Sequence, residues 1–428
     1  MENFDFVGQM MQMDQGAVRF VTDFFLLLDP EDLKACRLVS KQWDEFVKRE
    51  VWNNQYGKKR LTQMLQQRWM TENPKEEVLF NQEVNLENRE ITNMLCDEEH
   101  VYCADSMGKV RMFRLSDGVM ERELLPGPED ESRFDFEAKM AMKKDLLALE
   151  GDIPDPVFIT STLTVWNTTT SSTGEVIFRG SPGSSIKAME VMEGKIAIVE
   201  GGSDDDWWRR SLVVIEKVDN VWVRKDLAQW QLPRIAYAYM ASDQGLLVIL
   251  ELDTLRVYTS SDDGKELKMP VSGNGLGWGG MSMSLPFLFH FTFEAQGSRT
   301  CMVMQVFKVP TDKDIGTDPS LLKSINIDGF LSSSLRPFHS TLVVGVLFPG
   351  QTVGTLLQVF EKAKLQDAGV LPENIERRKV KLGADDVLPW LSSLNTTSLV
   401  YIKKDVQERL HRQSLVKRNF WMSNSKSE

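Results

Sequence analysis

Side chains whose types could do chemistry are few in this chain of 428 residues, and they are widely spaced. Cys96, His100 and Cys103 combine thiols with an imidazole, as zinc sites do. Cys96, however, ends one expected strand and Cys103 lies in the next, and no second group completes four ligands. His290 lies in an apolar stretch and is expected in the core. We therefore expect no metal site, no cofactor and no enzyme activity.

Residue types that suit binding gather in two loops. Residues 201–210 place two tryptophans beside two arginines, and Trp and Arg are frequent anchors of protein interfaces. Arginine also binds a phosphate or a carboxylate through two parallel hydrogen bonds. A second, glycine-rich loop at residues 273–280 carries one more tryptophan. One interpretation is a substrate-binding face, and the other is tryptophans that pack back on the sheet; the candidates are Trp207, Trp208, Arg209, Arg210 and Trp278.

Composition and charge narrow the class of partner. The chain is 42% hydrophobic and 26% charged, which is typical of a globular protein. A net charge of −12 argues against nucleic acid as the main partner. The start lacks the basic and apolar regions of a signal peptide, and apolar runs are too short to span a membrane. Four cysteines indicate a reducing compartment, the cytosol or the nucleus.

Residues 17–70 carry the spacing of helices. Pro30 suits the first position of a helix, and Asp29 before it suits the N-cap. Apolar residues then recur at three- and four-residue steps as far as Val47, which predicts one amphipathic helix. We expect another helix over residues 18–28. The expected divisions are a disordered start (1–16), a helical domain (17–56), a helical linker (57–75), a β-rich domain (76–422) and a disordered tail (423–428).

Residues 76–422 repeat a unit of four short strands. The clearest copy spans residues 91–125, with turns at 105–108 and 116–118. The third strands of six units align at residues 111–113, 164–166, 213–215, 256–258, 305–307 and 358–360. A period near 50 residues with four strands predicts a β-propeller, here with seven degenerate blades. The last unit lacks a fourth strand, and residues 77–84 would supply it and close the ring. A β-sandwich with many insertions is the alternative.

The helical segment resembles an F-box. The resemblance rests on Phe24-Phe25, Leu28-Asp29-Pro30-Glu31-Asp32-Leu33, Arg37-Leu38-Val39-Ser40-Lys41-Gln42-Trp43, Phe46-Val47 and Trp52. The family's usual Leu-Pro pair would fall at Gly16-Ala17, where this sequence departs from the pattern. F-box proteins dock the Skp-type adaptor of SCF ubiquitin ligases. The resemblance implies adaptor contacts through Phe24, Phe25, Leu28, Pro30, Leu33, Val39 and Trp43.

An F-box followed by a propeller resembles the F-box/WD-repeat substrate receptors. It implies a non-enzymatic receptor whose propeller binds a protein substrate for ubiquitination. We expect a separate internal core from Leu38, Phe46, Val47 and Trp52. Two alternatives stay open: a propeller scaffold whose degenerate F-box docks nothing, favoured by Gly16-Ala17, and a propeller hydrolase with acidic or histidine groups at its channel.

Overall fold

The computed structural model describes most of the chain. The described residues are 6–11, 13–28, 30–54, 56–57, 60, 75–83, 89–127, 132–134, 138–154, 159–202, 209–232, 237–259, 265–269, 280–296, 299–309, 318–327, 330–331, 336–338, 342–348, 356–367, 369–375, 377–381, 387–394, 398–407 and 410–419.

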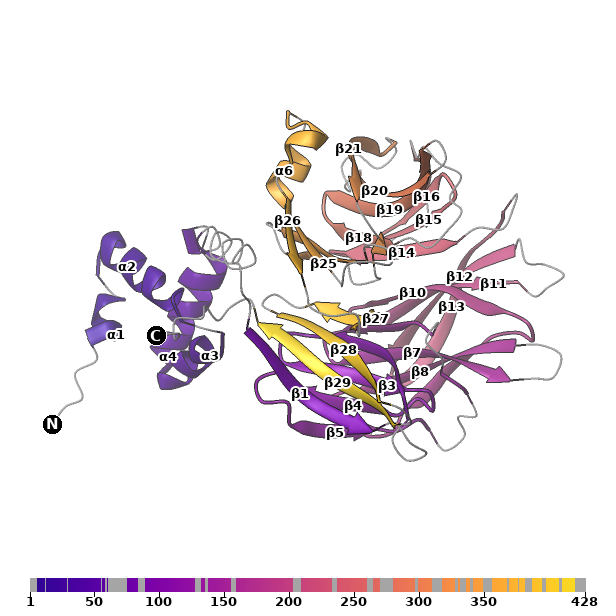
Figure 1. Ribbon diagram of the computed structural model, residues 1–428, viewed down its shortest axis with the longest axis horizontal. Coiled ribbons are helices and arrows are strands. Elements are labelled where there is room, and N and C mark those ends of the chain that lie inside the picture. The colour runs from indigo at the N-terminus through magenta and orange to yellow at the C-terminus, as the bar shows by residue number, and fades with distance from the viewer. Residues whose placement is uncertain are drawn as a thin grey trace.

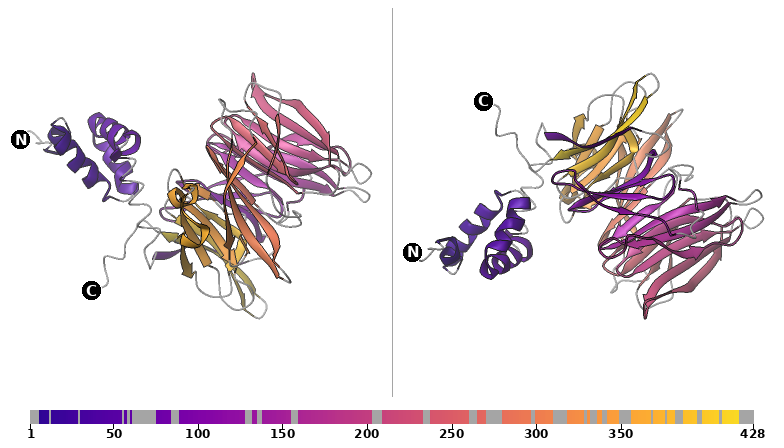
Figure 2. Two further views of the ribbon diagram at one scale, coloured as in Figure 1. Left: turned by 90° about the horizontal axis from the view of Figure 1, so that it is seen from above. Right: turned by 90° about the horizontal axis from the view of Figure 1, so that it is seen from below.

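The N-terminal helices form a separate body beside the sheets (Figure 2). They are α1 (Phe6–Met10), α2 (Gln15–Phe25), α3 (Pro30–Val39), α4 (Lys41–Phe46) and the π-helical η1 (Val47–Asn53). We call residues 6–57 the helical module.

The prediction of a single helix from Pro30 to Val47 is wrong, because the helix is interrupted at Ser40. The Ser40 hydroxyl accepts a hydrogen bond from the backbone N–H of Trp43 at 3.2 Å and so caps α4. Serine favours this local bond over a place inside a helix. Asp29, the expected cap of α3, lies outside the described residues, whereas α3 does begin at Pro30.

The core of the helical module is built around Phe25. Its ring lies 5.4 Å from that of Trp43 and 5.8 Å from that of Phe46. Met11 is buried in the same core, and Gln42 Nε2 donates to the Gly8 carbonyl at 2.6 Å. The expected disorder of residues 1–16 is therefore wrong for α1 and the start of α2, which pack on the later helices.

Beyond the helical module the described chain is mostly strand. In sequence order the strands are β1 (Lys75–Glu83), β2 (Ile91–Cys96), β3 (His100–Asp105), β4 (Val110–Arg114), β5 (Met120–Leu124), β6 (Met140–Lys143), β7 (Leu146–Pro154), β8 (Ile159–Asn167), β9 (Glu175–Arg179), β10 (Ser185–Met192), β11 (Lys195–Gly201), β12 (Arg209–Val218), β13 (Val221–Gln231), β14 (Ala238–Asp243), β15 (Leu246–Glu251), β16 (Thr254–Tyr258), β17 (Lys265–Lys268), β18 (Gly280–Ser284), β19 (Phe287–Gln296), β20 (Arg299–Lys308), β21 (Ser320–Ile327), β22 (Phe330–Leu331), β23 (Arg336–Phe338), β24 (Leu342–Phe348), β25 (Leu356–Glu361), β26 (Arg377–Lys381), β27 (Val387–Leu394), β28 (Ser398–Gln407) and β29 (Leu410–Asn419).

These strands pair into six four-stranded sheets and one five-stranded sheet among the described residues. We number the sheets in chain order: sheet 1 (β2–β5), sheet 2 (β6–β9), sheet 3 (β10–β13), sheet 4 (β14–β17), sheet 5 (β18–β21), sheet 6 (β22–β26) and sheet 7 (β27–β29 with β1). Every pairing between neighbouring strands of a sheet is antiparallel, as the predicted four-stranded repeat requires. The third strand of each of the first six repeats covers the predicted residues.

Most neighbouring sheets meet along their first strands, and sheet 6 joins its neighbours through β23 and β24, which makes a closed ring. β2 lies against β6, β6 against β10, β10 against β14 and β14 against β18, and the circuit returns through sheets 6 and 7 to β2 (Figure 1). Apolar clusters fill the spaces between sheets; one joins Val213 and Ile215 of sheet 3 to Leu163 of sheet 2. A ring of antiparallel sheets packed face to face is a β-propeller. The predicted propeller is confirmed at this level.

Tight turns inside the sheets depend on two glycines. Gly108 and Gly118 have φ angles of 74° and 72°, which favour glycine. A Cβ on Gly108 would also lie 2.3 Å from the Phe134 ring, so the turn after β3 has no room for a side chain. The predicted turns at 105–108 and 116–118 are in place.

Sheet 6 carries an insertion between β25 and β26. It contains α6 (Lys362–Gln366) and the short 3₁₀ helix η2 (Pro372–Asn374). The buried Lys323 of β21 holds it, because its Nζ donates to the Val370 carbonyl at 2.6 Å and also to the Asp367 carbonyl. In the part of the chain that the structure describes, no helix is long and apolar enough to cross a membrane.

The ring closes between the two ends of the propeller. β1 pairs antiparallel with β29 from Lys75 opposite Asn419 to Glu83 opposite Arg412. Glu76 accepts hydrogen bonds from Arg418 Nη2 at 2.8 Å and from the Tyr401 hydroxyl at 3.0 Å. The prediction that the N-terminal strand completes the last sheet is confirmed, and the closing strand follows the helical module in the sequence.

Two deletions separate the helical module from ring closure. Removing residues 1–74 should leave thermal unfolding of the propeller nearly unchanged, because β1 stays in sheet 7. Removing residues 1–83 should lower the unfolding midpoint by roughly 10 °C or more, since several kcal/mol of strand pairing are lost. Circular dichroism melting of both proteins measures the difference. Equal midpoints would show that β1 does not stabilise the ring.

Candidate functional site

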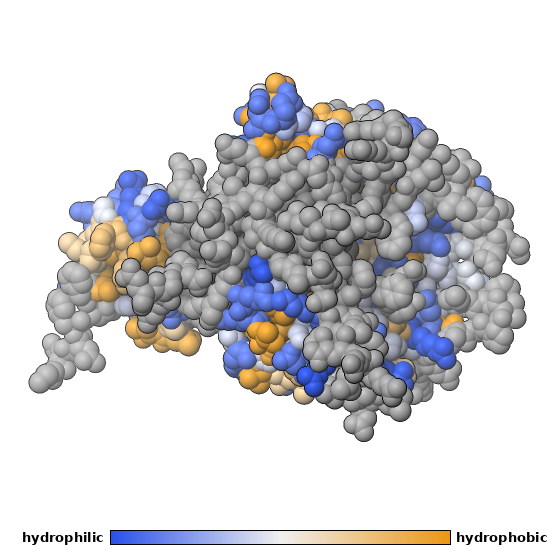
Figure 3. Space-filling model, viewed as in Figure 1, coloured by the Kyte–Doolittle hydropathy of each residue, from blue (hydrophilic) through white to orange (hydrophobic). Residues whose placement is uncertain are grey.

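The helical module leaves large apolar side chains in solvent. On α2, Phe20 is 64% exposed, Phe24 is also exposed, and Leu27 just beyond the helix is 71% exposed. Their four- and three-residue spacing puts them on one side of the helix. At the end of α3, Leu38 is 87% exposed, and Val39 beside it is exposed too. Figure 3 shows apolar surface on the helical module at the left of the molecule. We call these five residues the apolar surface of the module.

The predicted adaptor residues divide between this surface and the core. Phe24 and Val39 are exposed, Phe25 and Leu33 are buried, and Leu28 and Trp43 are partly buried against the core. Pro30 begins α3, and its side chain lies outside the described residues. Only part of the predicted set can therefore contact a partner directly; the buried members hold the helices that present the surface.

Two expectations about the core of the module have different outcomes. Phe46 and Val47 are buried as predicted. Leu38 is not: it lies on the outside of α3, so its prediction as a core residue is wrong. α3 ends at Val39, and a new helix begins after Ser40. The apolar spacing of α4 therefore does not apply to Leu38, and it could not predict which side of α3 Leu38 faces. The side chain of Trp52 lies outside the described residues.

Phe20 and Leu27 were missed as candidates. Their spacing with Phe24 was the signal that could have found them, because an apolar strip beyond what the core uses marks a binding face. The resemblance drew attention to the Phe24-Phe25 pair instead.

The structure describes only two of the five predicted substrate-binding residues. Trp207, Trp208 and Trp278 lie outside the described residues. Arg209 is exposed, and its Nη2 donates to Gln229 Oε1 at 3.0 Å. Arg210 is buried, so the expectation that it is an exposed anchor is wrong: its guanidinium enters the joint between sheets 3 and 4.

Arg210 belongs to a buried polar cluster centred on Glu251. Arg210 Nε lies 3.1 Å from Glu251 Oε1, and Trp230 Nε1 donates to Oε2 at 2.6 Å. Arg256 Nη1 lies 3.4 Å from Oε2, and its guanidinium is 4.4 Å from the Trp230 ring centre. Burial raises the pKa of Glu251, while the Trp230 hydrogen bond and the two arginines oppose the rise. The cluster fastens β12 and β13 to β15 and β16.

Other joints use different polar groups at the same end of the strands. Between sheets 7 and 1, Arg111 contacts Gln82, and Gln413 Oε1 accepts from the Ile91 N–H at 2.9 Å. Between sheets 2 and 3, Lys139 Nζ donates to the Ile186 carbonyl at 2.9 Å. These three joints thus differ in most of their polar groups.

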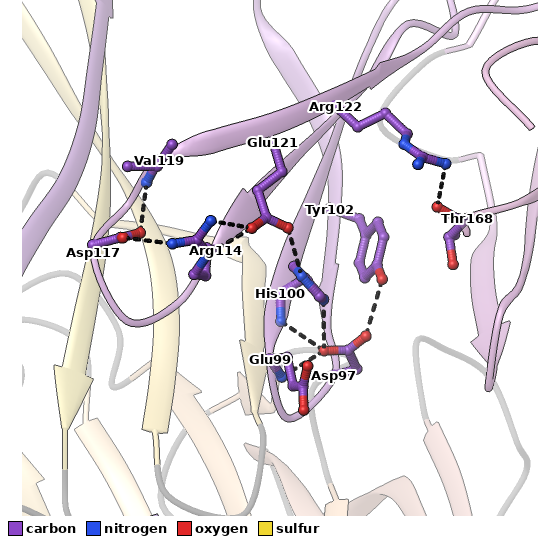
Figure 4. A network of polar contacts seen from close by, with 10 residues as sticks. All are labelled: Asp97, Glu99, His100, Tyr102, Arg114, Asp117, Val119, Glu121, Arg122 and Thr168. Atoms are coloured by element: carbon purple, nitrogen blue, oxygen red, sulfur yellow. Dashed lines mark hydrogen bonds and ion pairs between the residues drawn. The ribbon is translucent and has the colours of Figure 1, made fainter. Parts of the chain in front are cut away.

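The residues considered for zinc do not converge. Cys103 is fully buried, and burial raises the pKa of its thiol to about 12. His100 faces carboxylates instead: Nε2 lies 2.9 Å from Glu121 Oε2, and Nδ1 lies 3.7 Å from Asp97 Oδ1 (Figure 4). Within the described ranges no three His, Cys, Asp or Glu side chains group as metal ligands.

His290 is a core residue as predicted. It is buried in β19, its Nδ1 lies 3.5 Å from Gln305 Oε1, and its ring centre is 5.6 Å from that of Tyr239. Burial lowers the pKa of His290 to about 4, so the ring is neutral near pH 7. A neutral imidazole enclosed in apolar surroundings is suited to packing rather than to acid–base chemistry.

Of the comparisons with known proteins, only the one with solved structures finds similar proteins. No family model and no curated protein matches the sequence. The β-propeller domain of Cps50 (Swd1) from Myceliophteria thermophila is similar at 9% identity and a TM-score of 0.47, covering 80% of this chain and 99% of that one. U3-55K is similar at 11% identity and a TM-score of 0.48, covering 81% of this chain and 100% of that one. The β-propeller domain of the Trilobed protease from Pyrococcus furiosus is similar at 12% identity and a TM-score of 0.47, covering 80% of this chain and 96% of that one. Because these identities and TM-scores are low, the assignment of the propeller fold depends on the sheet topology described above.

Substitution of Arg210 tests whether it is structural. Arg210→Met leaves Glu251 short of one buried counter-charge and should cost about 3–5 kcal/mol of unfolding free energy. Arg209→Met is the matched control, because its exposed side chain should matter by less than about 0.5 kcal/mol. Urea unfolding measures both, and similar effects of the two substitutions would contradict the structural role.

The His100 contacts predict a pH dependence. The contact with Asp97 raises the pKa of His100 most, burial opposes it, and Glu121 raises it further. A raised folded pKa stabilises the protein below the unfolded value of about 6.5, and this stabilisation is lost as the pH rises through the folded pKa.

His100→Gln should therefore destabilise the protein more at about pH 5.5 than at about pH 8.5. Urea midpoints of wild type and variant at both pH values give the comparison. The same difference at each pH would exclude a charged His100.

Proposed function

We propose that this chain is the substrate-recognition subunit of an SCF-type ubiquitin ligase, with the helical module docking a Skp-type adaptor and the propeller binding a protein substrate. The observation that carries the proposal is the apolar surface of the module, which lies on the segment that resembles an F-box. A body of about 50 residues buries little surface by itself, so a partner that covers this surface adds to its stability.

The apolar surface is consistent with an adaptor rather than with the chain's own propeller. Burying a side chain such as Leu27 or Leu38 contributes about 1.5–3 kcal/mol. Both are among the most exposed large apolar side chains of the described chain. Contact with the propeller would have covered them, whereas an external helical partner can still do so.

The propeller supports the other half of the proposal as a rigid platform. We count the five-stranded sheet 6 as a blade and so propose seven blades. In this role the chain contributes proximity and orientation of the substrate, and no catalytic group or cofactor. We further propose that the substrate is a protein rather than nucleic acid or a membrane, which suits the net charge of −12. We propose that the chain acts in the cytosol or the nucleus.

A scaffold without ligase function is the second candidate. Gly16 and Ala17 stand where the F-box pattern has its Leu-Pro pair, and in the structure they form the capped first turn of α2. Asp14 Oδ1 accepts from the N–H groups of both, at 2.8 and 3.0 Å. The front of the module is therefore built differently, which favours a propeller that binds partners without the adaptor.

Adaptor capture separates the two candidates. Replacing Leu27 and Leu38 together by Asp should reduce capture of a Skp-type adaptor at least about tenfold, because charges enter the apolar contact. The measurement is affinity capture of purified adaptor on the full chain. Leu371→Asp is the matched control, since Leu371 is an exposed leucine of the propeller.

Leu27 and Leu38 test docking more directly than Leu33 or Trp43 do. The side chains of Leu33 and Trp43 pack in the core of the module, so replacing them would unfold it. Unchanged far-UV circular dichroism of the double variant shows that the module stays folded. Wild type that captures no adaptor, or a double variant that captures it fully, would favour the scaffold.

A further inference from the structure

The break between α3 and α4 presents one hydroxyl group, that of Ser40. Ser40 is the only residue between the two helices, and its backbone is extended, with φ −160° and ψ 162°. It is partly exposed. The sequence has no other serine or threonine between Thr22 and Thr62. An enzyme that modifies hydroxyl groups would therefore find a single serine target in this part of the module.

Cations flank Ser40 in the sequence. Arg37 lies three residues before it, and Lys41 follows it directly. Protein kinases select their substrates partly by charge pattern, and an arginine three residues before the target serine is one such pattern. The Arg37 side chain is 31% exposed and paired with Asp44. An ion pair at the surface contributes little to stability, so the guanidinium can leave Asp44 for a carboxylate of a kinase.

Ser40 borders the apolar surface of the module. Val39, directly before it, is 62% exposed, and Leu38 is 87% exposed. A phosphate on Ser40 would thus lie one residue away from this surface. Phosphoserine carries roughly 1.5 to 2 negative charges near pH 7, and its desolvation in an apolar contact costs free energy. A phosphorylated Ser40 would therefore oppose the binding of any partner that covers Leu38 and Val39.

A phosphate would also rearrange the charges between α3 and α4. Arg37 Nε lies 2.6 Å from Asp44 Oδ1, and Lys48 Nζ lies 2.6 Å from Oδ2. Hydrogen bonds from Lys48 and Arg37 lower the pKa of Asp44, so this carboxylate is charged near pH 7. A phosphate four residues before Asp44 repels it and attracts Arg37, since arginine binds phosphate through two parallel hydrogen bonds. Phosphorylation therefore changes the contacts of the end of α3 that carries Leu38 and Val39.

We propose that Ser40 is a phosphorylation site whose modification blocks docking of the adaptor. The kinase is of the class that selects an arginine three residues before the serine. In the reaction, the hydroxyl oxygen of Ser40 bonds to the γ-phosphorus of ATP, and the bond from that phosphorus to the β–γ bridging oxygen breaks. ADP leaves with the electron pair, and the hydroxyl proton is released. The inference deepens the proposed function and rests on it, because it regulates the same docking surface.

The first experiment locates the phosphate. The full chain is incubated with ATP and a purified arginine-directed kinase, and its peptides are mapped by mass spectrometry. Ser40 should be phosphorylated, and Arg37→Gln should slow the reaction at least about tenfold, because the selected charge is lost. Arg49→Gln is the matched control, since Arg49 is an exposed arginine of the module paired with Glu50. No phosphate on Ser40, or equal rates for the two variants, would overturn the assignment.

The second experiment measures docking on full chains that receive phosphoserine during synthesis, so that it needs no kinase. Phosphoserine at position 40 should reduce capture of purified Skp-type adaptor at least about tenfold. Ser40→Asn should capture the adaptor like wild type, because asparagine keeps the cap of α4 and has no hydroxyl group. Phosphoserine at position 116 is the matched control, since Ser116 is an exposed serine of the propeller. It should leave capture unchanged.

The outcomes separate regulation from docking and from folding. Equal capture with and without phosphate at position 40, or equal losses at positions 40 and 116, contradicts the blocking role. Unchanged far-UV circular dichroism supports a blocked contact, whereas an unfolded module would overturn that mechanism. An unmodified wild type that captures no adaptor contradicts the proposed function and, with it, the blocking role of Ser40. The phosphorylation site itself is still decided by mass spectrometry, which does not depend on the adaptor.

Discussion

Pairing of β1 with β29 is the constraint on which the rest of the propeller depends. Each sheet packs on two neighbours, so an open ring would expose an inner apolar face and an unpaired strand edge. The pairing satisfies the backbone of the last sheet, and Glu76 reinforces it with bonds to Arg418 and Tyr401. Although burial raises the pKa of Glu76, hydrogen bonds from Lys403, Arg418 and Tyr401 lower it overall. The carboxylate is therefore held charged at the closure.

The two parts of the chain treat apolar surface in opposite ways. In the described part of the propeller, most large apolar side chains lie in clusters between sheets, and buried polar groups such as Arg210 and Glu251 serve those joints. In the helical module, the core around Phe25 is complete while Leu27 and Leu38 stay in solvent. The first pattern builds a stable platform, and the second is typical of a surface that awaits a partner.

Much of this architecture was predictable from spacing. Third strands recur at nearly constant distances, and a missing last strand with an unassigned early one indicates closure. The limits have physical causes. A serine at position 40 stops a helix that the apolar period would continue, and period alone does not say whether Leu38 faces a core. Arg210 follows a tryptophan-rich loop in the sequence, yet its partner Glu251 is 41 residues away, and only the packing of sheet 3 on sheet 4 reveals it.

The closing contact also orders events in time. Glu76 and Arg418 are 342 residues apart, so during synthesis β1 leaves the ribosome long before its partner exists. The helical module is made earlier still, and its contacts are local, which favours early folding. Until β29 is made, the chain holds a formed module on an unpaired strand. With the proposed docking function, a nascent chain can thus meet the partner of its module before its propeller has closed.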